Sequence, residues 1–255
     1  MLSGERRQIT AQRLQAAGRV VVSELSAEFG VSEETIRRDL ERLEKEGLAL
    51  RTYGGAVLSR GEKAPPPYAI RKNTNVEEKL SVARQAAAML QDGDTLMVDE
   101  SSTAVYTVKA MCRLRGITLI TNSLEVLQEV GDREDWHVIS TGGHLKSDVM
   151  ALAGPHALRT IASYHVHYAL LSCRGINTQL GFADSSDEIV QVKQAMAAAA
   201  ECTILLADHR KFDRPGFAAL GPLELADRLV TDRPPPPEWK KRLEERGVSL
   251  CCETI

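Results

Sequence analysis

Residues 22–47 read VSELSAEFGVSEETIRRDLERLEKEG, and this stretch decides the fold of the N-terminal part of the chain. We expect a short helix that ends at Gly30, a tight turn, and a longer helix that begins after Ser32. Ser23 and Ser32 can each cap the helix that follows, because a serine hydroxyl accepts a hydrogen bond from a free backbone N–H of the first turn. Two helices joined by such a turn form a helix-turn-helix.

The second of these helices carries two adjacent arginines away from its apolar face. Ile36, Leu40 and Leu43 share one face, since residues spaced three and four apart are neighbours on a helix. Arg38 lies almost opposite this face, and Arg37 lies on its flank. A glutamate stands four residues from each arginine, and such a pair stabilises an exposed helix by only about 0.2–0.5 kcal/mol. On the helix alone, a solvated surface is the simpler interpretation.

The flanking sequence favours a functional interpretation. A helix over 4–17 and an extended RVVV segment precede the helix-turn-helix, and two short strands around Tyr53-Gly54-Gly55 follow it as a wing. In such a unit the second helix enters the major groove, where arginine reads guanine, and the wing approaches phosphates. Glycines at the wing would permit a close approach. The candidate DNA-binding residues are Ser32, Glu34, Thr35, Arg37, Arg38, Arg51, Tyr53, Gly54 and Gly55.

Composition places the chain in the cytoplasm. The 255 residues carry a net charge of -3, so binding to nucleic acid must use locally placed charges. The five cysteines form no CxxC pair, which fits a reducing compartment and predicts neither a disulfide framework nor a metal site. No apolar run is long enough to span a membrane, and the polar N-terminus is unlike a secretory signal.

The N-terminal residues 5–57 resemble the DNA-binding domain of the DeoR family of bacterial transcription regulators. The resemblance is carried by VSELSAEFGVSEETIRRDLERLEKEG and by the wing RTYGGA, in which Tyr53 stands where the family often has histidine. It implies a transcription regulator, expected to be a repressor, that binds double-stranded operator DNA as a homo-oligomer. Pairing of two half-sites requires at least a dimer, and the family adds the tetramer.

From about residue 77, apolar strands alternate with helical runs such as 77–91 and 187–201. This alternation predicts an α/β domain with a mostly parallel sheet. We therefore expect a winged helix-turn-helix over 1–58, a proline-rich linker over 59–76, and an effector-binding and oligomerisation domain over 77–255. A last helix and a short strand, VSLCC, end the chain. The expected strands of the sheet are 95–99, 117–121, 136–140, 167–172, 203–208 and 228–232.

Polar and glycine-rich turns follow several of these strands, in the segments DESST, TNS and TGG. In a parallel sheet, ligands bind beyond the carboxyl ends of the strands, and free N–H groups at helix N-termini bind phosphate. Asp99 suits sugar hydroxyls, while Arg174 and Lys211 suit a phosphate. Ser185 and Glu188 have the spacing of a capping box. The candidate effector-binding residues are Asp99, Ser101, Ser102, Thr103, Thr121, Asn122, Ser123, Gly142, Gly143, Arg174, Gly175, Glu188, Lys193, Asp208 and Lys211.

Residues 77–232 also resemble the effector domain of the DeoR family, which is similar in fold to ribose-phosphate and glucosamine-phosphate isomerases. The resemblance implies a phosphorylated sugar as the effector. It also favours Lys193 as an effector-binding residue over a merely solvated side chain. Ser101 stands where the family usually has glycine, and Glu100 adds a nearby negative charge. The segment SCRGINTQLGF lacks the acids with which the isomerases abstract a proton, so a sensor without turnover and without a cofactor is expected.

Other interpretations remain open at this point. The chain could be a sugar-phosphate isomerase with an accessory DNA domain, or its helix-turn-helix could serve protein contacts only. Each serine or threonine before a helix could be a simple cap, and Asp208 and Lys211 could form a loop ion pair. His165 and His167 could share a strand face, but nothing at a supporting spacing completes a metal site. Cys173, beside Arg174, is either a thiol of lowered pKa or a buried, inert one.

Overall fold

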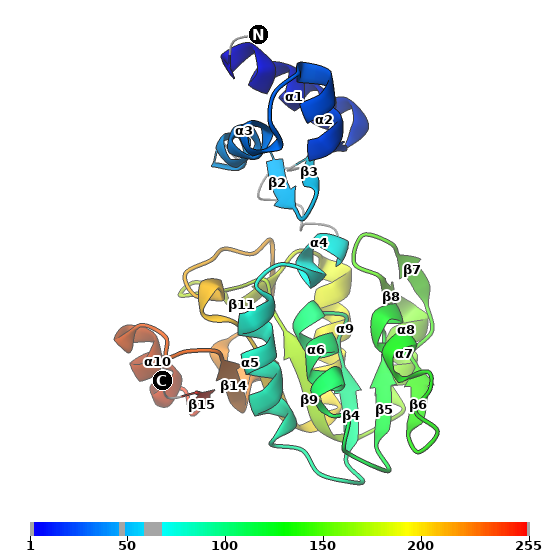
Figure 1. Cartoon of the computed structure of the whole chain (residues 1–255). Coiled ribbons are helices and arrows are strands. Elements are labelled where there is room, and N and C mark those ends of the chain that lie inside the picture. The colour runs from blue at the N-terminus through cyan, green and yellow to red at the C-terminus, as the bar shows by residue number, and fades with distance from the viewer. Residues whose placement is uncertain (1–2, 46–48, 59–67, 254–255) are drawn as a thin grey trace. The chain divides into compact units, whose positions relative to one another are not determined.

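The computed structural model describes residues 3–45, 49–58 and 68–253, which belong to two compact units (Figure 1). The first unit is Met1–Pro66 and the second is Pro67–Ile255. The division falls inside the predicted linker, whose residues 59–67 lie outside the described part of the chain. Each unit has an apolar core of its own.

The first unit has the predicted winged helix-turn-helix fold. Its helices pack against a three-stranded antiparallel sheet with the order β1-β3-β2, and the β2–β3 hairpin is the wing. The predicted apolar face of the second helix of the motif lies at the centre of the core, with Ile36, Leu40 and Leu43 each at most 2% exposed. In chain order the elements are α1 (Ser3–Ala17), β1 (Arg19–Val21), α2 (Val22–Phe29), α3 (Glu33–Lys45), β2 (Ala49–Thr52) and β3 (Gly55–Leu58).

The turn between α2 and α3 follows the sequence prediction. Gly30 ends α2 in the left-handed conformation, with φ of 62°, which glycine adopts without a steric penalty. Ser32 caps α3, because its Oγ accepts a hydrogen bond from the N–H of Thr35 at 3.2 Å. This pair of signals therefore sets the angle at which α3 leaves the turn.

The predicted cap at Ser23 is wrong. The chain passes from β1 directly into α2, so Ser23 lies inside the first turn and Val21 occupies the cap position without a side-chain cap. A backbone group takes the place of the serine, since the N–H of Val22 donates to the carbonyl oxygen of Gly54 at 2.8 Å. The wing turn thus satisfies one of the free donors at the start of α2.

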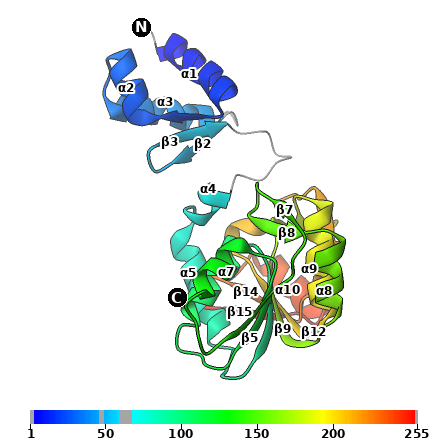
Figure 2. The same ribbon diagram turned by 90° about the vertical axis from the view of Figure 1, so that its right-hand side faces the viewer.

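The second unit is built on a seven-stranded parallel sheet with the order β15-β14-β12-β9-β4-β5-β6. Helices α5 to α7 cover one face, and α8 to α10 cover the other (Figure 2). The strands are β4 (Thr95–Val98), β5 (Thr118–Thr121), β6 (His137–Ser140), β9 (Val166–Ser172), β12 (Ala200–Leu206), β14 (Arg228–Thr231) and β15 (Ser249–Cys252). The helices are α5 (Val76–Ala87), α6 (Ser102–Ala110), α7 (Leu124–Val130), α8 (Pro155–Ala162), α9 (Asp187–Ala198) and α10 (Pro237–Glu245).

All of the predicted strands of this sheet are present, but two small antiparallel sheets were not predicted. One pairs β7 with β8, and the other has the order β10-β11-β13. Their strands have only three or four residues, too few for an alternating apolar pattern to stand out from the loops. They are β7 (His144–Lys146), β8 (Ala151–Ala153), β10 (Gly175–Asn177), β11 (Gly181–Asp184) and β13 (Ala218–Gly221), and the short 3-10 helices are η1 (His209–Lys211) and η2 (Leu223–Leu225).

The end of the predicted linker forms a helix, α4 (Tyr68–Lys72), that belongs to the second unit. Tyr68 is 3% exposed and packs in the core that α5 and α6 share. The hydroxyl of Tyr106 in α6 donates to the carbonyl oxygen of Lys72 at 3.2 Å. The hydroxyl of Ser102, the first residue of α6, lies 3.5 Å from the carbonyl oxygen of Arg71 in α4. Because α6 begins just after β4, this contact places α4 over the carboxyl end of the sheet (Figure 1). The second unit therefore begins ten residues before the predicted start at residue 77.

Candidate DNA-binding surface and effector site

The N-terminal half of α3 presents polar side chains to solvent. The hydroxyls of Ser32 and Thr35 lie 2.9 Å apart, and the side chains of Arg37 and Arg38 are 53% and 76% exposed. Each arginine pairs with a glutamate one turn earlier, Arg38 with Glu34 as predicted and Arg37 with Glu33. Exposed pairs of this kind are weak, so DNA phosphates or bases can replace the glutamates at little cost.

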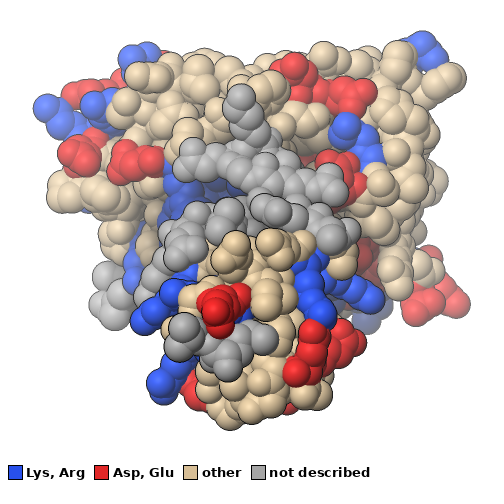
Figure 3. Space-filling view, turned by 90° about the horizontal axis from the view of Figure 1, so that it is seen from above, with Lys and Arg blue, Asp and Glu red and all other residues tan. Residues whose placement is uncertain are grey.

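The side chain of Tyr53, at the tip of the wing, is fully exposed to solvent. The side chain of Arg51 is held by a carboxylate of α3. The guanidinium and the backbone N–H of Arg51 both donate to the carboxylate of Glu44, at 2.9 and 3.0 Å. Gly54 is open to solvent on its Cβ side. Figure 3 shows basic and acidic side chains intermixed over the face in view, as the net charge of -3 leads one to expect.

Gly55 has a structural role in the sheet of this unit, and its contact with DNA stays a prediction. It is the first residue of β3 and pairs with Val21 of β1. A Cβ atom at Gly55 would lie 1.9 Å from the carbonyl oxygen of Val20, far inside contact distance. Glycine is needed here because two backbones meet.

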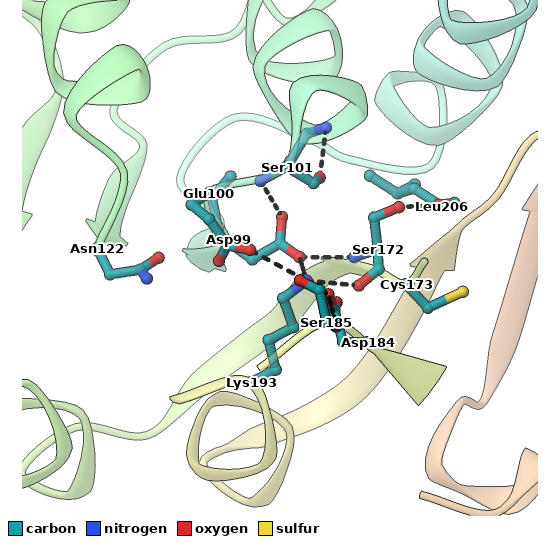
Figure 4. Close-up of polar contacts among 12 residues, drawn as sticks. Asp99, Glu100, Ser101, Asn122, Ser172, Cys173, Asp184, Ser185, Lys193 and Leu206 are labelled. Atoms are coloured by element: carbon teal, nitrogen blue, oxygen red, sulfur yellow. Dashed lines mark hydrogen bonds and ion pairs between the residues drawn. The ribbon is translucent and has the colours of Figure 1, made fainter. Parts of the chain in front are cut away.

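At the carboxyl end of the parallel sheet, a buried ammonium contacts three carboxylates (Figure 4). The Nζ atom of Lys193 in α9 lies 3.1 Å from Asp99, 3.2 Å from Glu100 and 2.7 Å from Asp184. Burial alone would lower the pKa of Lys193, but the three carboxylates raise it well above its ordinary value. Lys193 is thus a permanent cation in the interior.

The carboxylate of Asp99 is fully engaged by the protein. It accepts hydrogen bonds from the N–H of Ser101 at 2.9 Å and from the N–H of Ser172 at 2.7 Å, besides its contact with Lys193. Asp99 therefore ties β4 to β9 at the strand ends and leaves little capacity for the sugar hydroxyls that the sequence suggested.

The predicted serines and threonines at the strand ends act mainly as caps. Ser101 caps α6 by accepting from the N–H of Ala104 at 3.1 Å, and Ser123 caps α7 in the same way from Val126 at 3.2 Å. Thr121 donates to the carbonyl oxygen of Val98 at 2.7 Å. Ser102 and Thr103 form the buried first turn of α6. The backbone of this turn is available to an anion, whereas most of the hydroxyls are engaged.

Two of the predicted cations, Arg174 and Lys211, lie near two that the sequence reasoning missed, Arg71 and Lys79. Burial lowers the pKa of Arg174, and the positive charge of Arg71 lowers it further, against the effect of Asp184. Burial also lowers the pKa of Lys79 to about 8, with Lys211 as the largest electrostatic cause in the same direction. We call these four residues, from α4, α5, the β9–β10 turn and η1, the basic cluster.

Arg71 has buried nitrogen atoms without a hydrogen-bond partner, its Nε and Nη2. Its guanidinium lies over the ring of Tyr68, 5.4 Å from the centroid, and the hydroxyl of Tyr68 is also unpartnered. Two further unpartnered buried atoms are Glu100 Oε2 and Asn122 Oδ1, at the ends of β4 and β5. We call the region bounded by α4, these strand ends and the basic cluster the strand-end site.

Other predicted residues have structural roles. Gly143 and Gly175 are glycines because a Cβ atom would lie 2.3 Å from the carbonyl oxygens of Ala153 and Arg214, respectively. Gly142 adopts a φ of 63° in the turn before β7. Asp208 caps η1 by accepting a hydrogen bond from the N–H of Arg210, in place of the loop ion pair with Lys211. The ammonium of Lys211 donates to the hydroxyl of Ser172 at 2.8 Å and to the carbonyl oxygen of Cys173 at 2.7 Å.

The predicted capping box of Ser185 and Glu188 is wrong. The cap position of α9 is Ser186, and it makes no side-chain cap hydrogen bond. Glu188 instead bonds to Lys146 of β7 at 2.6 Å and lies 3.4 Å from His144, so it links α9 to the β7–β8 hairpin. The spacing S-x-x-E alone cannot distinguish a capping box from a contact with the hairpin, because His144 and Lys146 lie far from Glu188 in the sequence.

Comparisons with known proteins agree with the two units. A model of the DeoR-like helix-turn-helix domain matches residues 6–61, and a model of the DeoR C-terminal sensor domain matches residues 74–233. The chain belongs to the DeoR family. It is therefore a DNA-binding transcriptional regulator with a sensor domain, and not a sugar-phosphate isomerase.

Relatives of this DeoR-family regulator match along nearly the whole chain. The regulator YulB of Bacillus subtilis (strain 168) is 38% identical over 98% of this chain and 96% of its own. The glycerol-3-phosphate regulon repressor of Escherichia coli (strain K12) is 31% identical over 91% and 92%. Among solved structures, ribose 5-phosphate isomerase A of Methanocaldococcus jannaschii has 16% identity and a TM-score of 0.40 over 55% of each chain.

Three smaller expectations concern histidine, cysteine and the membrane. His165 and His167 have different partners, Glu201 at 3.8 Å and Asp94 at 3.3 Å, so they do not face a common site. Cys173 is the buried thiol of the two alternatives, and burial raises its pKa to about 12. Within the described ranges of this DeoR-family chain, no helix combines the length and apolar character that a bilayer crossing requires.

Proposed function

We propose that this DeoR-family regulator represses an operon for sugar or carbohydrate catabolism, and that a phosphorylated sugar relieves the repression. The winged unit binds operator DNA through the N-terminal half of α3 and through the wing. The effector binds at the strand-end site, with its phosphate on the basic cluster. The name of one relative, the glycerol-3-phosphate regulon repressor of Escherichia coli (strain K12), supports this proposal.

The observation that carries the effector proposal is the guanidinium of Arg71, whose Nε and Nη2 are buried without a partner. An unsatisfied buried group costs about 1–3 kcal/mol, and a charged group costs more. A phosphate oxygen pair would accept both N–H groups in the planar geometry that guanidinium favours. The backbone N–H groups at the start of α6 and the ammonium of Lys211 add further donors to the same region.

The position of α4 supports a route from effector to operator. This helix carries Arg71 and is the first described element after the linker residues 59–67. A phosphate that binds Arg71 changes the contacts of α4, and the chain leads from α4 directly into the winged unit. The effector thereby favours an arrangement with low operator affinity, and the coupling equals the difference of its affinity for the two arrangements.

The working regulator is a homo-oligomer in the cytoplasm, a dimer or a tetramer. A helix-turn-helix that reads two half-sites one helical turn apart needs two copies of α3. The second unit supplies the oligomer contacts, since it holds the larger part of the chain. Light scattering of the full-length chain at micromolar concentration tests this part of the proposal.

The full-length chain is tested in two steps. Operator fragments are first selected from genomic DNA, and their binding is then titrated by fluorescence anisotropy with and without phosphorylated sugars and their unphosphorylated parents. We expect operator release by one or a few phosphorylated compounds only. Failure of every fragment to bind, with undiminished function after Arg37→Ala plus Arg38→Ala, would favour a helix-turn-helix used for protein contacts. Release by an unphosphorylated sugar would contradict the phosphate role of the basic cluster.

A further inference from the structure

Two buried oxygen atoms without partners lie at the ends of neighbouring strands. Glu100 is 2% exposed and its Oε2 has no hydrogen-bond partner, and Asn122 is 0% exposed and its Oδ1 has none. Strands β4 and β5 pair with Val98 opposite Thr121, so Glu100 and Asn122 come two and one residues after this pair. Figure 4 shows both side chains beside the cluster around Lys193.

Both oxygens are held in place by the other atom of their group. The Nδ2 of Asn122 donates to the carbonyl oxygen of Leu152 at 3.2 Å, which directs Oδ1 away from β8. The Oε1 of Glu100 lies 3.2 Å from the ammonium of Lys193, which leaves Oε2 free. Neither oxygen can turn to water without breaking these contacts, so each retains an unfilled hydrogen-bonding capacity in the interior.

The carboxyl group of Glu100 differs from those of Asp99 and Asp184 in its contacts. Asp99 accepts two backbone N–H groups, and Asp184 accepts the N–H and hydroxyl of Ser185, in addition to Lys193. The side chain of Glu100 has the contact with Lys193 at 3.2 Å, longer than the 2.7 Å of Asp184. Burial raises the pKa of Glu100, against the effect of Lys193, which lowers it.

We propose that Glu100 and Asn122 bind the hydroxyl groups of the effector, and that Glu100 determines which phosphorylated sugar this chain accepts. The inference rests on the function proposed above. A hydroxyl group can donate a hydrogen bond, so one hydroxyl can donate to Oε2 of Glu100 while a neighbouring one donates to Oδ1 of Asn122. The phosphate belongs at Arg71, because Glu100 and the neighbouring carboxyl groups of Asp99 and Asp184 would repel an anion.

The test measures binding to the full-length chain by thermal shift and calorimetry. The probes are glycerol 3-phosphate, ribose 5-phosphate, fructose 6-phosphate, glucosamine 6-phosphate and inorganic phosphate. Glu100→Gln keeps the shape and the Lys193 contact but removes the ionisable oxygen, and Asn122→Ala leaves the Lys193 cluster intact. Glu224→Gln is the matched control, since Glu224 is an exposed carboxylate bound to Arg246.

We expect Glu100→Gln to change the order of affinities within the sugar panel, with about a tenfold loss for the preferred compound, and Asn122→Ala to cause a similar loss. Binding of inorganic phosphate should stay within about twofold of wild type, and Glu224→Gln should change the binding of neither phosphate nor sugar phosphates. If Glu100→Gln fails to fold, Asn122→Ala decides the question by the same two readouts.

The outcomes separate this inference from the proposed function. Equal losses for inorganic phosphate and for every sugar phosphate would overturn the inference, because they would mean a collapsed site. An unchanged order and strength of binding in Glu100→Gln and Asn122→Ala would overturn it while the proposed function stands. A wild-type chain that binds no phosphorylated probe would overturn the proposed function, and the inference with it.

Discussion

The buried ammonium of Lys79 donates a hydrogen bond to the backbone carbonyl oxygen of Arg71, so one side chain of α5 holds the end of α4. A second hydrogen bond reaches the carbonyl oxygen of Thr74 at 2.6 Å. The last carbonyl groups of a helix lack intrahelical donors, and a positive charge beside them is favourable. Lys79 therefore positions the segment that presents Arg71 to the strand-end site.

Lys79→Met should loosen this segment and weaken effector binding. Hydrogen bonds to a charged group are worth about 1.5–3 kcal/mol each, so we expect at least about a tenfold lower affinity for the effector. The measurement is a calorimetric titration of the full-length chain. Lys240→Met on the exposed side of α10 removes the same charge elsewhere and should leave affinity unchanged. Equal affinities for both variants would show that α4 is held without Lys79.

The pH dependence of stability should reveal the same lysine. Its folded pKa is about 8 and its ordinary value is 10.5, so the unfolded chain binds more protons between these two values. The contribution of Lys79 to the free energy of unfolding therefore rises with pH across this window, by up to about 1.4 kcal/mol per pH unit. Urea unfolding at pH 7.5 to 9.5 should show a smaller upward trend, or a steeper decline, in Lys79→Met than in wild type. Parallel pH profiles would contradict the lowered pKa.

Lys193→Met should destabilise the second unit strongly. The substitution leaves Asp99 and Asp184 buried without their common cation, and such a loss typically costs about 3–5 kcal/mol. Chemical unfolding followed by circular dichroism measures the effect. Lys241→Met, at an exposed pair with Glu245, should cost less than about 1 kcal/mol. A small loss at Lys193 would mean that the carboxyls take up protons in its place, which a steep acid dependence would reveal.

The two wing glycines should respond differently to the same substitution. Gly55→Ala puts a methyl group 1.9 Å from the carbonyl oxygen of Val20, so β1 and β3 must separate at a cost of roughly 1–3 kcal/mol or more. Gly54→Ala meets no atom within 4 Å. Thermal unfolding should therefore show a marked loss for Gly55→Ala and almost none for Gly54→Ala. The reverse order would mean that β3 does not pack on β1 in solution.

Substitution of the α3 arginines should reduce operator affinity without loss of stability. Each arginine that contacts a base should cost about 1–3 kcal/mol when changed to alanine and should relax specificity at that base. Arg42→Ala, on the same helix beyond its N-terminal half, is the matched control for charge. Anisotropy titrations at several salt concentrations separate base contacts from phosphate contacts. Loss of a phosphate contact makes the dependence of operator affinity on salt concentration less steep. If Arg37→Ala, Arg38→Ala and Arg42→Ala bind alike, the arginines contribute charge only.

Much of the fold follows from local sequence signals. Gly30 and Ser32 define the turn of the helix-turn-helix, and the apolar runs of the second unit predict its strands to within a few residues. Such signals work because capping needs particular side chains and because strands buried on both faces are apolar throughout. The sites were less predictable: Arg71 lay in a proline-rich segment that looked like a linker, Lys193 is buried, and Glu188 contacts a hairpin and does not cap α9.

Local patterns in the chain predict the two units, the exposed arginines of α3 and the edge of the sheet at which polar turns collect. The contacts of Lys193 with Asp99, Glu100 and Asp184, and the position of Arg71 of α4 over the same strand ends, emerge from the packing of the second unit. The contacts of Lys193 with Asp99 and Glu100 join residues more than ninety positions apart, and the contact of Ser102 with Arg71 joins residues 31 positions apart. Helix and strand periodicity describe neighbours along the chain, whereas charge and hydrogen-bond partners at such distances depend on how the parallel strands are ordered in the sheet.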